Sequence, residues 1–442
     1  MTLKVRRLVT ISFIILFLLI GGFLIFYSTG LLIDLKNLTL SRSGAIYLEA
    51  QTKDIQIKIG KEKLQLNPGL FKDGILVTNL LPKNYKVEAS KEGYQNWTKN
   101  IYVKPSLVSR TYPIILLPND WSAELIYKDV AGFWTGKKYS AWKTSSGKLF
   151  INGKKAAGTD LKNWLYGDNS ALTYDSAEKS YFVVNPDQNN AALNISLIFN
   201  NLAATELNSS AKIFPHPYDQ KKLILNSAGE IYVLDFSNFK LETLNEKNSS
   251  VALAQNKELF IIKKTGLYSY NLATKSKKVI SSKITALPEK MEVSSDGLTL
   301  AFLSGEKITL INTASLESTV ISSSAKYFKF SPDGKKIAFW EDSGEIRVYF
   351  LAEQQKWSDK KSGDYASLGY YQLDQSHPFD WHSGSAHLLI KFPEKTYLLE
   401  IDDRQPINQQ IINLKMDDYQ YNPANNFVYF ITDGIFYKTG LE

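Results

Sequence analysis

Hydrophobic and polar positions divide the chain into two unequal parts. Residues 8–33 hold no charged side chain, and the run from Leu8 to Tyr27 is mostly Leu, Ile, Phe and Val. Twenty helical residues rise about 30 Å, which matches the hydrocarbon thickness of a bilayer. We therefore predict a transmembrane helix over residues 8–30. The rest of the chain alternates apolar and polar positions in short runs between turn residues, which is typical of β-strands.

A cleaved signal sequence and a buried core helix are the alternatives for the apolar run. A secretory signal has a shorter apolar region that ends in small residues, and the one candidate site, Ser28-Thr29-Gly30, fits this poorly. A core helix would show polar residues on one face, which this segment lacks. A retained anchor is therefore the favoured interpretation.

The charges beside the apolar run predict its orientation. Lys4, Arg6 and Arg7 precede it, whereas Asp34 and Lys36 follow it and cancel. The positive-inside rule then places residues 1–7 in the cytoplasm as a short tail and the bulk of the chain outside. Since no second apolar stretch of this length occurs, we expect a single-pass protein of the cell membrane.

After a linker at residues 31–43, residues 44–118 predict a small β-sandwich. The expected strands are 44–50, 54–60, 64–66, 75–80, 85–89 and 99–103. Strands with one apolar face and no helix beside them need a second sheet to cover that face.

Part of this region resembles a known family. The segments Leu80–Val87 and Lys91–Tyr94, followed by Trp97, resemble the C-terminal half of a PEGA domain. Where that family has its Pro-Glu-Gly-Ala signature, this chain has Thr52-Lys-Asp-Ile55. The resemblance implies a module without catalytic residues that lies beside a bacterial membrane. A small sandwich of any other family, serving as a spacer, is the alternative and predicts nearly the same role.

A repeat of about 40 residues runs through residues 119–442 and predicts a β-propeller. Its clearest copy is the strand Tyr327–Phe330, the turn Ser331-Pro-Asp-Gly334 and the strand Ile337–Phe339. Ser, Pro and Gly at these positions suit a type I turn. Related units begin near residues 131, 164, 213, 251, 291, 327, 379 and 419. The Ser-Pro-Asp-Gly turns resemble the repeats of the TolB-like and WD40-like propeller families.

The two ends of this region are expected to meet. The last unit ends after its third strand, Gly434–Tyr437, and Ala123–Tyr127 could supply the missing outer strand. This closure would remove open sheet edges and favours eight blades; seven remain possible if one weak unit is not a blade. The predicted fold class is therefore all-β: an N-terminal transmembrane helix, a PEGA-like sandwich and a propeller.

Composition narrows the setting of the protein. The chain has no Cys, so it can form neither disulfides nor the acylated anchor of a lipoprotein. An extracytoplasmic chain of this kind suggests a bacterial envelope. The net charge of +8 is scattered and contains no block of five like charges, so no nucleic-acid partner is expected.

The sequence carries no clear catalytic motif. His377, His382 and His387 are spaced five apart, which points neighbours to opposite faces of a strand and predicts no metal site. Ala131–Lys137 partly resembles the tryptophan docking motif of quinoprotein dehydrogenases, but it occurs once and with altered spacing, so no cofactor is expected. Asp402-Asp403 is predicted to be solvated.

The longest departure from the repeat, residues 353–378, is the candidate ligand-binding loop. It carries Trp357, Tyr365, Tyr370 and Tyr371. Long loops on rigid scaffolds often bind partners. The alternative is an extended outer strand and crossover with packed aromatic side chains.

The favoured function is a membrane-anchored binding or scaffold protein that recognises envelope protein or polysaccharide through propeller loops. A lyase or hydrolase with a site in the central channel is one alternative, although the inner strands mostly offer apolar and hydroxyl residues. A structural component of a surface array is another.

Overall fold

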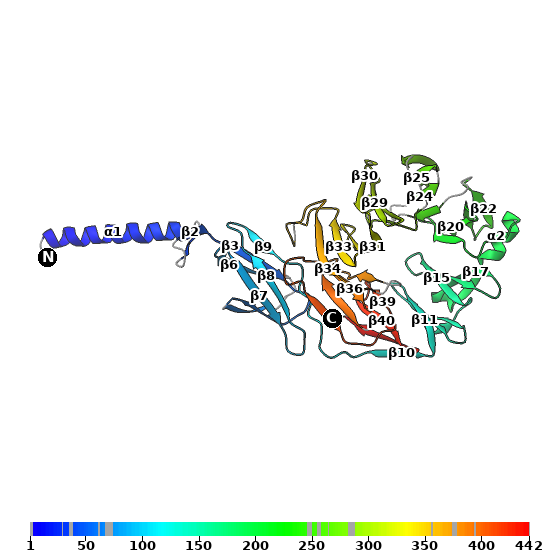
Figure 1. The fold of residues 1–442 in the computed structure, drawn as a ribbon, viewed down its shortest axis with the longest axis horizontal. Coiled ribbons are helices and arrows are strands. Elements are labelled where there is room, and N and C mark those ends of the chain that lie inside the picture. The colour runs from blue at the N-terminus through cyan, green and yellow to red at the C-terminus, as the bar shows by residue number, and fades with distance from the viewer. Residues whose placement is uncertain are drawn as a thin grey trace.

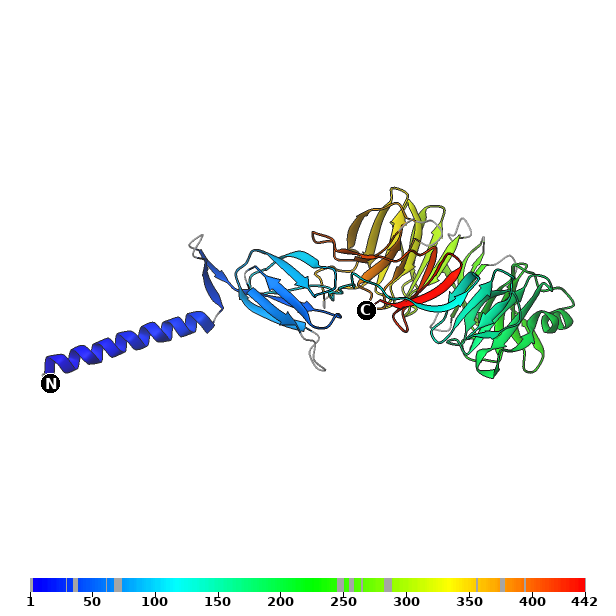
Figure 2. The same cartoon turned by 90° about the horizontal axis from the view of Figure 1, so that it is seen from below.

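The computed structural model describes residues 3–28, 30–34, 39–60, 62–66, 74–244, 250–253, 258–263, 265–281, 288–354, 357–373, 378–392 and 395–441. A helix, a small β domain and a large β domain follow one another along the long axis (Figures 1 and 2). The helix, α1 (Leu3–Ser28), projects away from the rest of the molecule. Its segment Val5–Gly22 has a mean hydropathy of 2.0 and none of it is buried, so it is long and apolar enough to cross a membrane.

A short hairpin connects α1 to the small β domain. Strands β1 (Leu31–Asp34) and β2 (Thr39–Arg42) pair antiparallel. At its base, the backbone N–H of Ser43 donates to the carbonyl of Gly30 at 2.7 Å. The carbonyl of Ser43 in turn accepts a hydrogen bond from the N–H of Ser106 at 2.9 Å. This bond connects the 104–108 loop of the small domain to the hairpin.

The small domain consists of two sheets around one core. The first has the order β6-β3-β9 and the second β5-β4-β7-β8. The strands are β3 (Gly44–Glu49), β4 (Ile55–Ile59), β5 (Glu62–Leu66), β6 (Gly74–Leu80), β7 (Asn84–Ser90), β8 (Trp97–Tyr102) and β9 (Val108–Arg110). Ile55, Ile57 and Ile59 alternate with exposed residues and point into the core shared by both sheets, as their spacing predicts. Strand β9, which pairs parallel to β3, was not expected from the sequence.

Eight four-stranded antiparallel sheets follow within the described part of residues 124–440. The first sheet contains β11 (Val130–Thr135), β12 (Ser140–Thr144), β13 (Leu149–Ile151) and β14 (Lys154–Lys155), and the second contains β15 (Asp160–Leu165), β16 (Ser170–Asp175), β17 (Ser180–Asn185) and β18 (Ala191–Asn194). The third contains β19 (Lys212–Pro215), β20 (Lys222–Ser227), β21 (Glu230–Asp235) and β22 (Lys240–Thr243). The fourth contains β23 (Ser250–Leu253), β24 (Glu258–Lys263), β25 (Gly266–Asn271) and β26 (Ser276–Ser281).

The other four complete the domain. They are β27 (Lys290–Val293), β28 (Thr299–Ser304), β29 (Lys307–Asn312) and β30 (Ser318–Ser322); β31 (Ala325–Phe330), β32 (Lys336–Glu341), β33 (Glu345–Phe350) and β34 (Tyr365–Tyr370); β35 (Phe379–Trp381), β36 (His387–Lys391), β37 (Thr396–Glu400) and β38 (Gln409–Ile412); and β39 (Asp418–Asn422), β40 (Phe427–Thr432), β41 (Ile435–Gly440) and β10 (Glu124–Lys128).

The sheets are arranged as in a β-propeller. The first strand of one sheet contacts the first strand of the next, as in β23–β27, β27–β31, β31–β35 and β39–β11, so these strands are innermost. The predicted closure is confirmed: β10, which precedes the first sheet in the chain, pairs antiparallel with β41 in the last sheet. The turn at Ser331–Gly334 also forms as predicted, because the N–H of Gly334 donates to the carbonyl of Ser331 at 2.9 Å.

Two helical elements interrupt the β pattern. Helix α2 (Ile195–Ala203) follows β18 and buries Ile195, Ile198 and Phe199 against the sheet beside it. Asn194 caps the N-terminus of α2, because its side-chain oxygen accepts a hydrogen bond from the N–H of Leu197. A single 3-10 turn, η1 (Pro186–Gln188), joins β17 and β18. Helix α2 lies at the end of the molecule opposite α1 (Figure 1).

Candidate functional site

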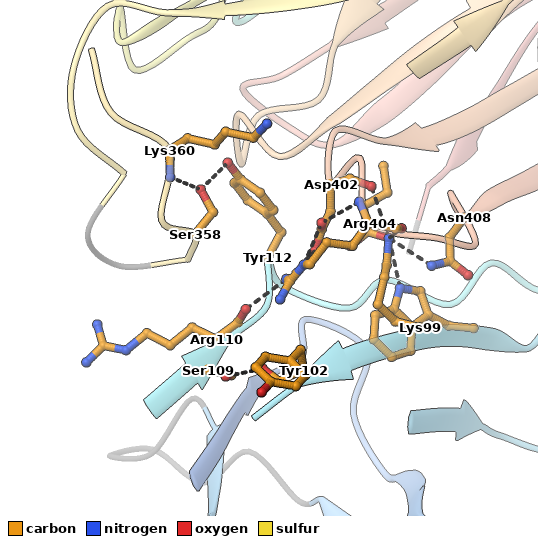
Figure 3. A network of polar contacts seen from close by, with 12 residues as sticks. Lys99, Tyr102, Ser109, Arg110, Tyr112, Ser358, Lys360, Asp402, Arg404 and Asn408 are labelled. Carbon is orange, nitrogen blue, oxygen red and sulfur yellow. Dashed lines mark hydrogen bonds and ion pairs between the residues drawn. The ribbon is translucent and has the colours of Figure 1, made fainter. Parts of the chain in front are cut away.

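A cleft of about 600 Å³ lies where the small domain meets the propeller. One wall is formed by residues 102–110 of the small domain, and the other by Ser358–Lys360 and Ile401–Arg404 of the propeller. Tyr112, from the segment that links the two domains, also lines it, as Figure 3 shows. A cavity of this volume is in the range of small-molecule binding sites. The chain therefore offers one candidate site at a domain boundary.

A buried ion pair forms the base of this junction. Lys99 of β8 and Glu400 of β37 are 0% and 1% exposed, and their Nζ and Oε2 atoms are 3.1 Å apart. The same Nζ donates to the carbonyls of Asp402 and Arg404 at 3.1 and 3.0 Å (Figure 3). Three acceptors around one ammonium offset the cost of removing its charge from water.

Glu400 is held by further donors from both domains. The indole Nε1 of Trp97 donates to its Oε2 at 3.1 Å, and Nδ2 of Asn408 does so at 2.9 Å. Burial raises the pKa of Glu400, Lys99 acts against this rise, and the nearby carboxylate of Asp402 adds to it. The other carboxylate oxygen, Oε1, is buried without a hydrogen-bond partner.

Arg404 and the buried Asp402 form a second ion pair at the cleft wall. The Arg404 Nε donates to Oδ1 of Asp402 at 2.8 Å, and its Nη2 donates to the carbonyl of Arg110 at 2.8 Å. Although burial opposes ionisation, the Arg404 guanidinium holds the pKa of Asp402 below its ordinary value. The prediction that this aspartate is solvated is wrong, because docking of the small domain covers it and leaves it 3% exposed.

The propeller also covers an edge strand of the small domain. Strand β8 is the last strand of its sheet, so its outer N–H groups need partners. The N–H of Thr98 donates to Oδ1 of Asn408 at 3.0 Å, and that of Asn100 donates to the carbonyl of Gln405 at 3.1 Å. The segment 405–408 thus takes the place of a neighbouring strand.

Side-chain amides extend the junction along the linker. Gln95 and Ile411 exchange two hydrogen bonds, at 2.7 Å to the carbonyl and 2.9 Å from the N–H of Ile411. Gln410 accepts from the N–H of Leu117 at 2.6 Å and donates to the carbonyl of Ile115. These amides satisfy backbone groups that have no strand partner. The small domain and the last blades are therefore fastened at many points.

Most of the predicted ligand-binding loop contacts this junction or its own blade. The Trp357 ring lies 5.7 Å from the ring of Tyr112, and its Nε1 donates to Glu49 of β3 at 3.4 Å. Tyr365 begins β34, the outer strand of its sheet, and packs under the guanidinium of Arg347 at 4.4 Å.

The last two aromatic residues of the loop differ in exposure. Tyr371 packs on Phe392, with ring centroids 5.8 Å apart, and its hydroxyl donates to the carbonyl of Leu368 at 2.9 Å. Tyr370 is 70% exposed. Of the four aromatic residues, Tyr370 is thus the one whose ring faces solvent, and the structure does not bring them together into one surface. A role of the loop in ligand binding stays a prediction.

His382 and His387 lie close to each other in the blade formed by β35–β38. Their rings are 6.0 Å apart, and His382 stacks on Tyr421 at 5.5 Å. Burial lowers the pKa of His387 well below its ordinary value, and the nearby His382 and Lys99 act in the same direction. His377 lies outside the described residues. No group of three or more His, Asp or Glu side chains that could hold a metal ion occurs within the described ranges.

A second cluster of charged residues lies on the innermost strands of the propeller. Lys290 of β27 has its Nζ 3.0 Å from Glu292 and 3.9 Å above the ring of Tyr327. Lys329 of β31 forms an ion pair with Asp380 of β35. The indole of Trp381 donates to the carbonyl of Lys329 at 3.0 Å. Three neighbouring blades therefore supply charges to one place.

Burial and pairing shift the acid–base properties of this inner-strand cluster. Burial lowers the pKa of Lys290, and it raises the pKa of Tyr327 to about 12. Burial also disfavours the charge on Lys329, but the carboxylate of Asp380 outweighs it and raises the lysine pKa. Within this cluster the pKa of Lys329 is therefore raised above its ordinary value, whereas that of Lys290 is lowered.

The sequence carried a signal for this cluster that motif searches missed. Glu292, Lys329, Asp380 and Gln420 occupy the same position in four successive repeats, two residues before the residue that opens the turn. Three of them reach the next blade: Glu292 accepts from the N–H of Phe330 at 3.4 Å, and Lys329 pairs with Asp380. Gln420 accepts from the N–H of Thr135 at 2.9 Å and donates to the carbonyl of Phe133 at 3.0 Å. Comparing equivalent positions across the repeats, rather than searching for known motifs, would have found it.

Comparisons with known proteins add likenesses of fold. No family model matches the chain, and no curated protein matches it. Kluyveromyces lactis Hsv2 is 12% identical, with a TM-score of 0.44 over 64% of this chain and 98% of that one. The β-propeller domain of Myceliophteria thermophila Cps50 (Swd1) is 10% identical, with a TM-score of 0.39 over 73% and 100% of the two chains.

An enzyme is also among the similar solved structures. Oligogalacturonate lyase in complex with manganese is 12% identical, with a TM-score of 0.44 over 73% of this chain and 99% of that one. These likenesses are low, and the assignment of a propeller rests on the strand pairing of this chain itself.

Proposed function

We propose that this protein is a membrane-anchored binding or scaffold protein, and that its propeller recognises a protein or polysaccharide of the cell envelope. In this proposal α1 crosses the cell membrane, with Lys4, Arg6 and Arg7 in the cytoplasm and the two β domains outside. Eight blades and a PEGA-like sandwich complete the architecture.

Exposure of α1 supports the membrane anchor. None of the segment Val5–Gly22 is buried; Phe17, for example, is 76% exposed and Leu19 is 67% exposed. A soluble protein rarely exposes an apolar surface of this extent to water. A bilayer would cover it over about the length of one membrane-spanning helix.

The observation that carries the binding role is the junction between the two β domains. The buried pair Lys99–Glu400 and the covered edge of β8 fix the propeller on the small domain. A rigid connection holds the propeller loops at a set distance from α1, and preorganised surfaces lose less entropy on binding. The cleft between the domains is lined by both apolar and polar side chains, as small-molecule sites commonly are.

Retention of envelope components by the full chain tests this proposal. The protein, reconstituted in lipid nanodiscs, is immobilised and exposed to solubilised envelope proteins and to cell-wall glycans. We expect saturable retention of one component that empty nanodiscs do not show. Absence of retention, together with turnover of a substrate in a hydrolase or lyase screen, would contradict the binding role.

The inner-strand cluster favours a second candidate, a lyase or hydrolase with its site in the central channel. Lys290 carries an amine with a lowered pKa, and Tyr327 lies directly beneath it. Amines of this kind can act as general bases. If turnover is found, Lys290→Met should abolish it, whereas Lys415→Met, at an exposed ion pair with Asp433, should leave it unchanged.

A further inference from the structure

The end of the small domain next to α1 carries exposed apolar side chains. Tyr102, Leu107 and Val108 are 51%, 56% and 41% exposed, and Leu40 of the adjoining hairpin is 57% exposed. We call these four residues the exit surface; three of them, Tyr102, Leu107 and Val108, also line the small-domain wall of the cleft described above. Single exposed apolar residues are common, whereas apolar residues gathered beside a membrane-spanning helix are candidates for contact with lipid.

Two backbone hydrogen bonds place this surface close to the end of α1. Gly30 lies two residues after the helix, its carbonyl is bonded by Ser43, and the carbonyl of Ser43 is bonded by Ser106. Each such bond joins chains about 5 Å apart, so Leu107 lies roughly 10 Å from Gly30. If α1 crosses a bilayer, the exit surface therefore lies at the level of the lipid headgroups.

Basic residues surround the exit surface. Lys83 and Lys104 are exposed, and the N–H of Val103 donates to the carbonyl of Lys83 at 3.0 Å, which places Lys83 beside the same loop. Lys104 forms an ion pair with Asp359 of the propeller. Arg110 follows at the other side of the loop and is exposed. Apolar side chains flanked by Lys and Arg are typical of surfaces that enter the headgroup region.

The net positive charge of the chain lies in its first 118 residues. Residues 1–118 contain 16 Lys and Arg against 7 Asp and Glu, whereas residues 119–442 contain 36 against 37. The excess of positive charge therefore belongs to the helix, the hairpin and the small domain. Cations near a membrane surface are attracted by anionic lipids, whereas a neutral propeller is not.

We infer that the exit surface is a second membrane contact, in which Tyr102, Leu107 and Val108 enter the headgroup region of a bilayer that contains anionic lipid. This inference rests on the proposed membrane anchor. It adds that the small domain lies on the bilayer instead of hanging from α1 by a flexible hairpin. Two contacts with the bilayer, α1 and the exit surface, would fix the direction in which the propeller points.

The absence of Cys from the chain allows a direct test. Leu107→Cys and Leu197→Cys variants of the full chain each carry one environment-sensitive fluorophore. Leu197 lies on α2 at the far end of the molecule and is 59% exposed, close to the value for Leu107, so it is a matched control. Both are reconstituted in vesicles of phosphatidylcholine and phosphatidylglycerol, with or without brominated acyl chains that quench on contact.

We expect brominated lipid to reduce the emission of the Leu107 label about twofold and to leave the Leu197 label unchanged. Adding Lys83→Glu to the Leu107→Cys variant should weaken the quenching; if it does not, the assignment of anionic headgroups falls. Resistance of the protein to alkaline extraction from the same vesicles reports insertion of α1 separately. Extraction-resistant protein with no quenching at position 107 overturns the inference alone, whereas extracted protein overturns the proposed anchor as well.

Discussion

Single residues at the junction are expected to control stability far more than residues on the surface. Lys99→Met removes a fully buried ammonium and leaves the carboxylate of Glu400 without its cation. Breaking a buried pair in this way costs about 3–5 kcal/mol of unfolding free energy. Denaturant unfolding of the detergent-solubilised full chain measures this loss.

A surface pair provides the matched control for this prediction. Lys58 pairs with Glu88 at 3.2 Å but is 51% exposed, so Lys58→Met should cost less than about 1 kcal/mol. Replacing both members of the buried pair, Lys99→Met with Glu400→Leu, should recover much of the lost stability. Equal effects of the two lysine variants would show that the junction contributes little.

His387 predicts a pH dependence of stability. Its pKa is far below the ordinary value of 6.5 in the folded protein, so it stays neutral there, whereas it takes up a proton in the unfolded chain. Its contribution is therefore present above pH 6.5 and is lost as the pH falls, by up to about 1.4 kcal/mol per pH unit.

The slope of the unfolding free energy against pH tests this prediction for His387. Unfolding free energies between neutral and mildly acidic pH should decrease for the original protein and decrease less for His387→Gln. The same slope in both proteins would mean that the imidazole is protonated or solvated in the folded state.

At the residue scale, the sequence predicted roles that depend on neighbours in the chain and not those that depend on docking. The turn at Ser331–Gly334 follows from local chemistry and forms as expected. Lys99 and Glu400 are about 300 positions apart, and nothing in either local sequence indicates a fully buried charge. Asp402 was assigned to solvent for the same reason, because its burial depends on contact with another domain.

Among the elements, the segment from residue 353 to 378 offers the clearest test, because it contains both a packed and an exposed aromatic residue. Trp357→Ala removes a partly buried ring that contacts Tyr112 and Glu49, so we expect about 1–3 kcal/mol lower stability and faster proteolysis of the linker near residues 111–118. Tyr370→Ala should change stability by less than about 0.5 kcal/mol, since its ring is 70% exposed.

The same pair of variants separates packing from binding. If the segment recognises a ligand, Tyr370→Ala should reduce retention of an envelope component by the nanodisc-bound protein while leaving its melting temperature unchanged. Reduced retention only in the unstable Trp357 variant would assign the segment to the junction alone.

At the element scale, periodicity predicted most strands but not the helix or the parallel strand. Ile55, Ile57 and Ile59 alternate and form β4, and Ala123–Tyr127 overlaps the strand that closes the last sheet. Helix α2 is nine residues long, too short for its periodicity to stand out within a β repeat. Strand β9 has three residues and forms because β3 offers it a parallel partner, which is a tertiary effect.

On the scale of the whole molecule, the uneven distribution of charge and the fixed junction between the β domains give the protein two distinct ends. The end with α1 carries the excess positive charge, and the propeller is close to neutral. The buried junction transmits the orientation of the small domain to the propeller, because Gln95 of the small domain and Leu117 of the linker both form hydrogen bonds with residues of β38. A ligand-binding surface on the propeller would thus keep a fixed distance and direction from the bilayer.

The orientation of the chain in the membrane depends on the charges that flank α1. Lys4, Arg6 and Arg7 precede the apolar run, and we expect a reporter enzyme that works only outside the cytoplasm to be active when fused after Glu442. Replacing all three basic residues with Gln should reduce this activity, and it should raise the signal of a reporter that folds only in the cytoplasm. Lys415→Gln, an exposed change far from the helix, is the control and should alter neither signal. Because a retained anchor and a cleaved signal both export the reporter, the length of the fusion protein in the membrane fraction decides between them: the anchor predicts the full chain there, and a soluble fusion shortened by the apolar run would contradict it.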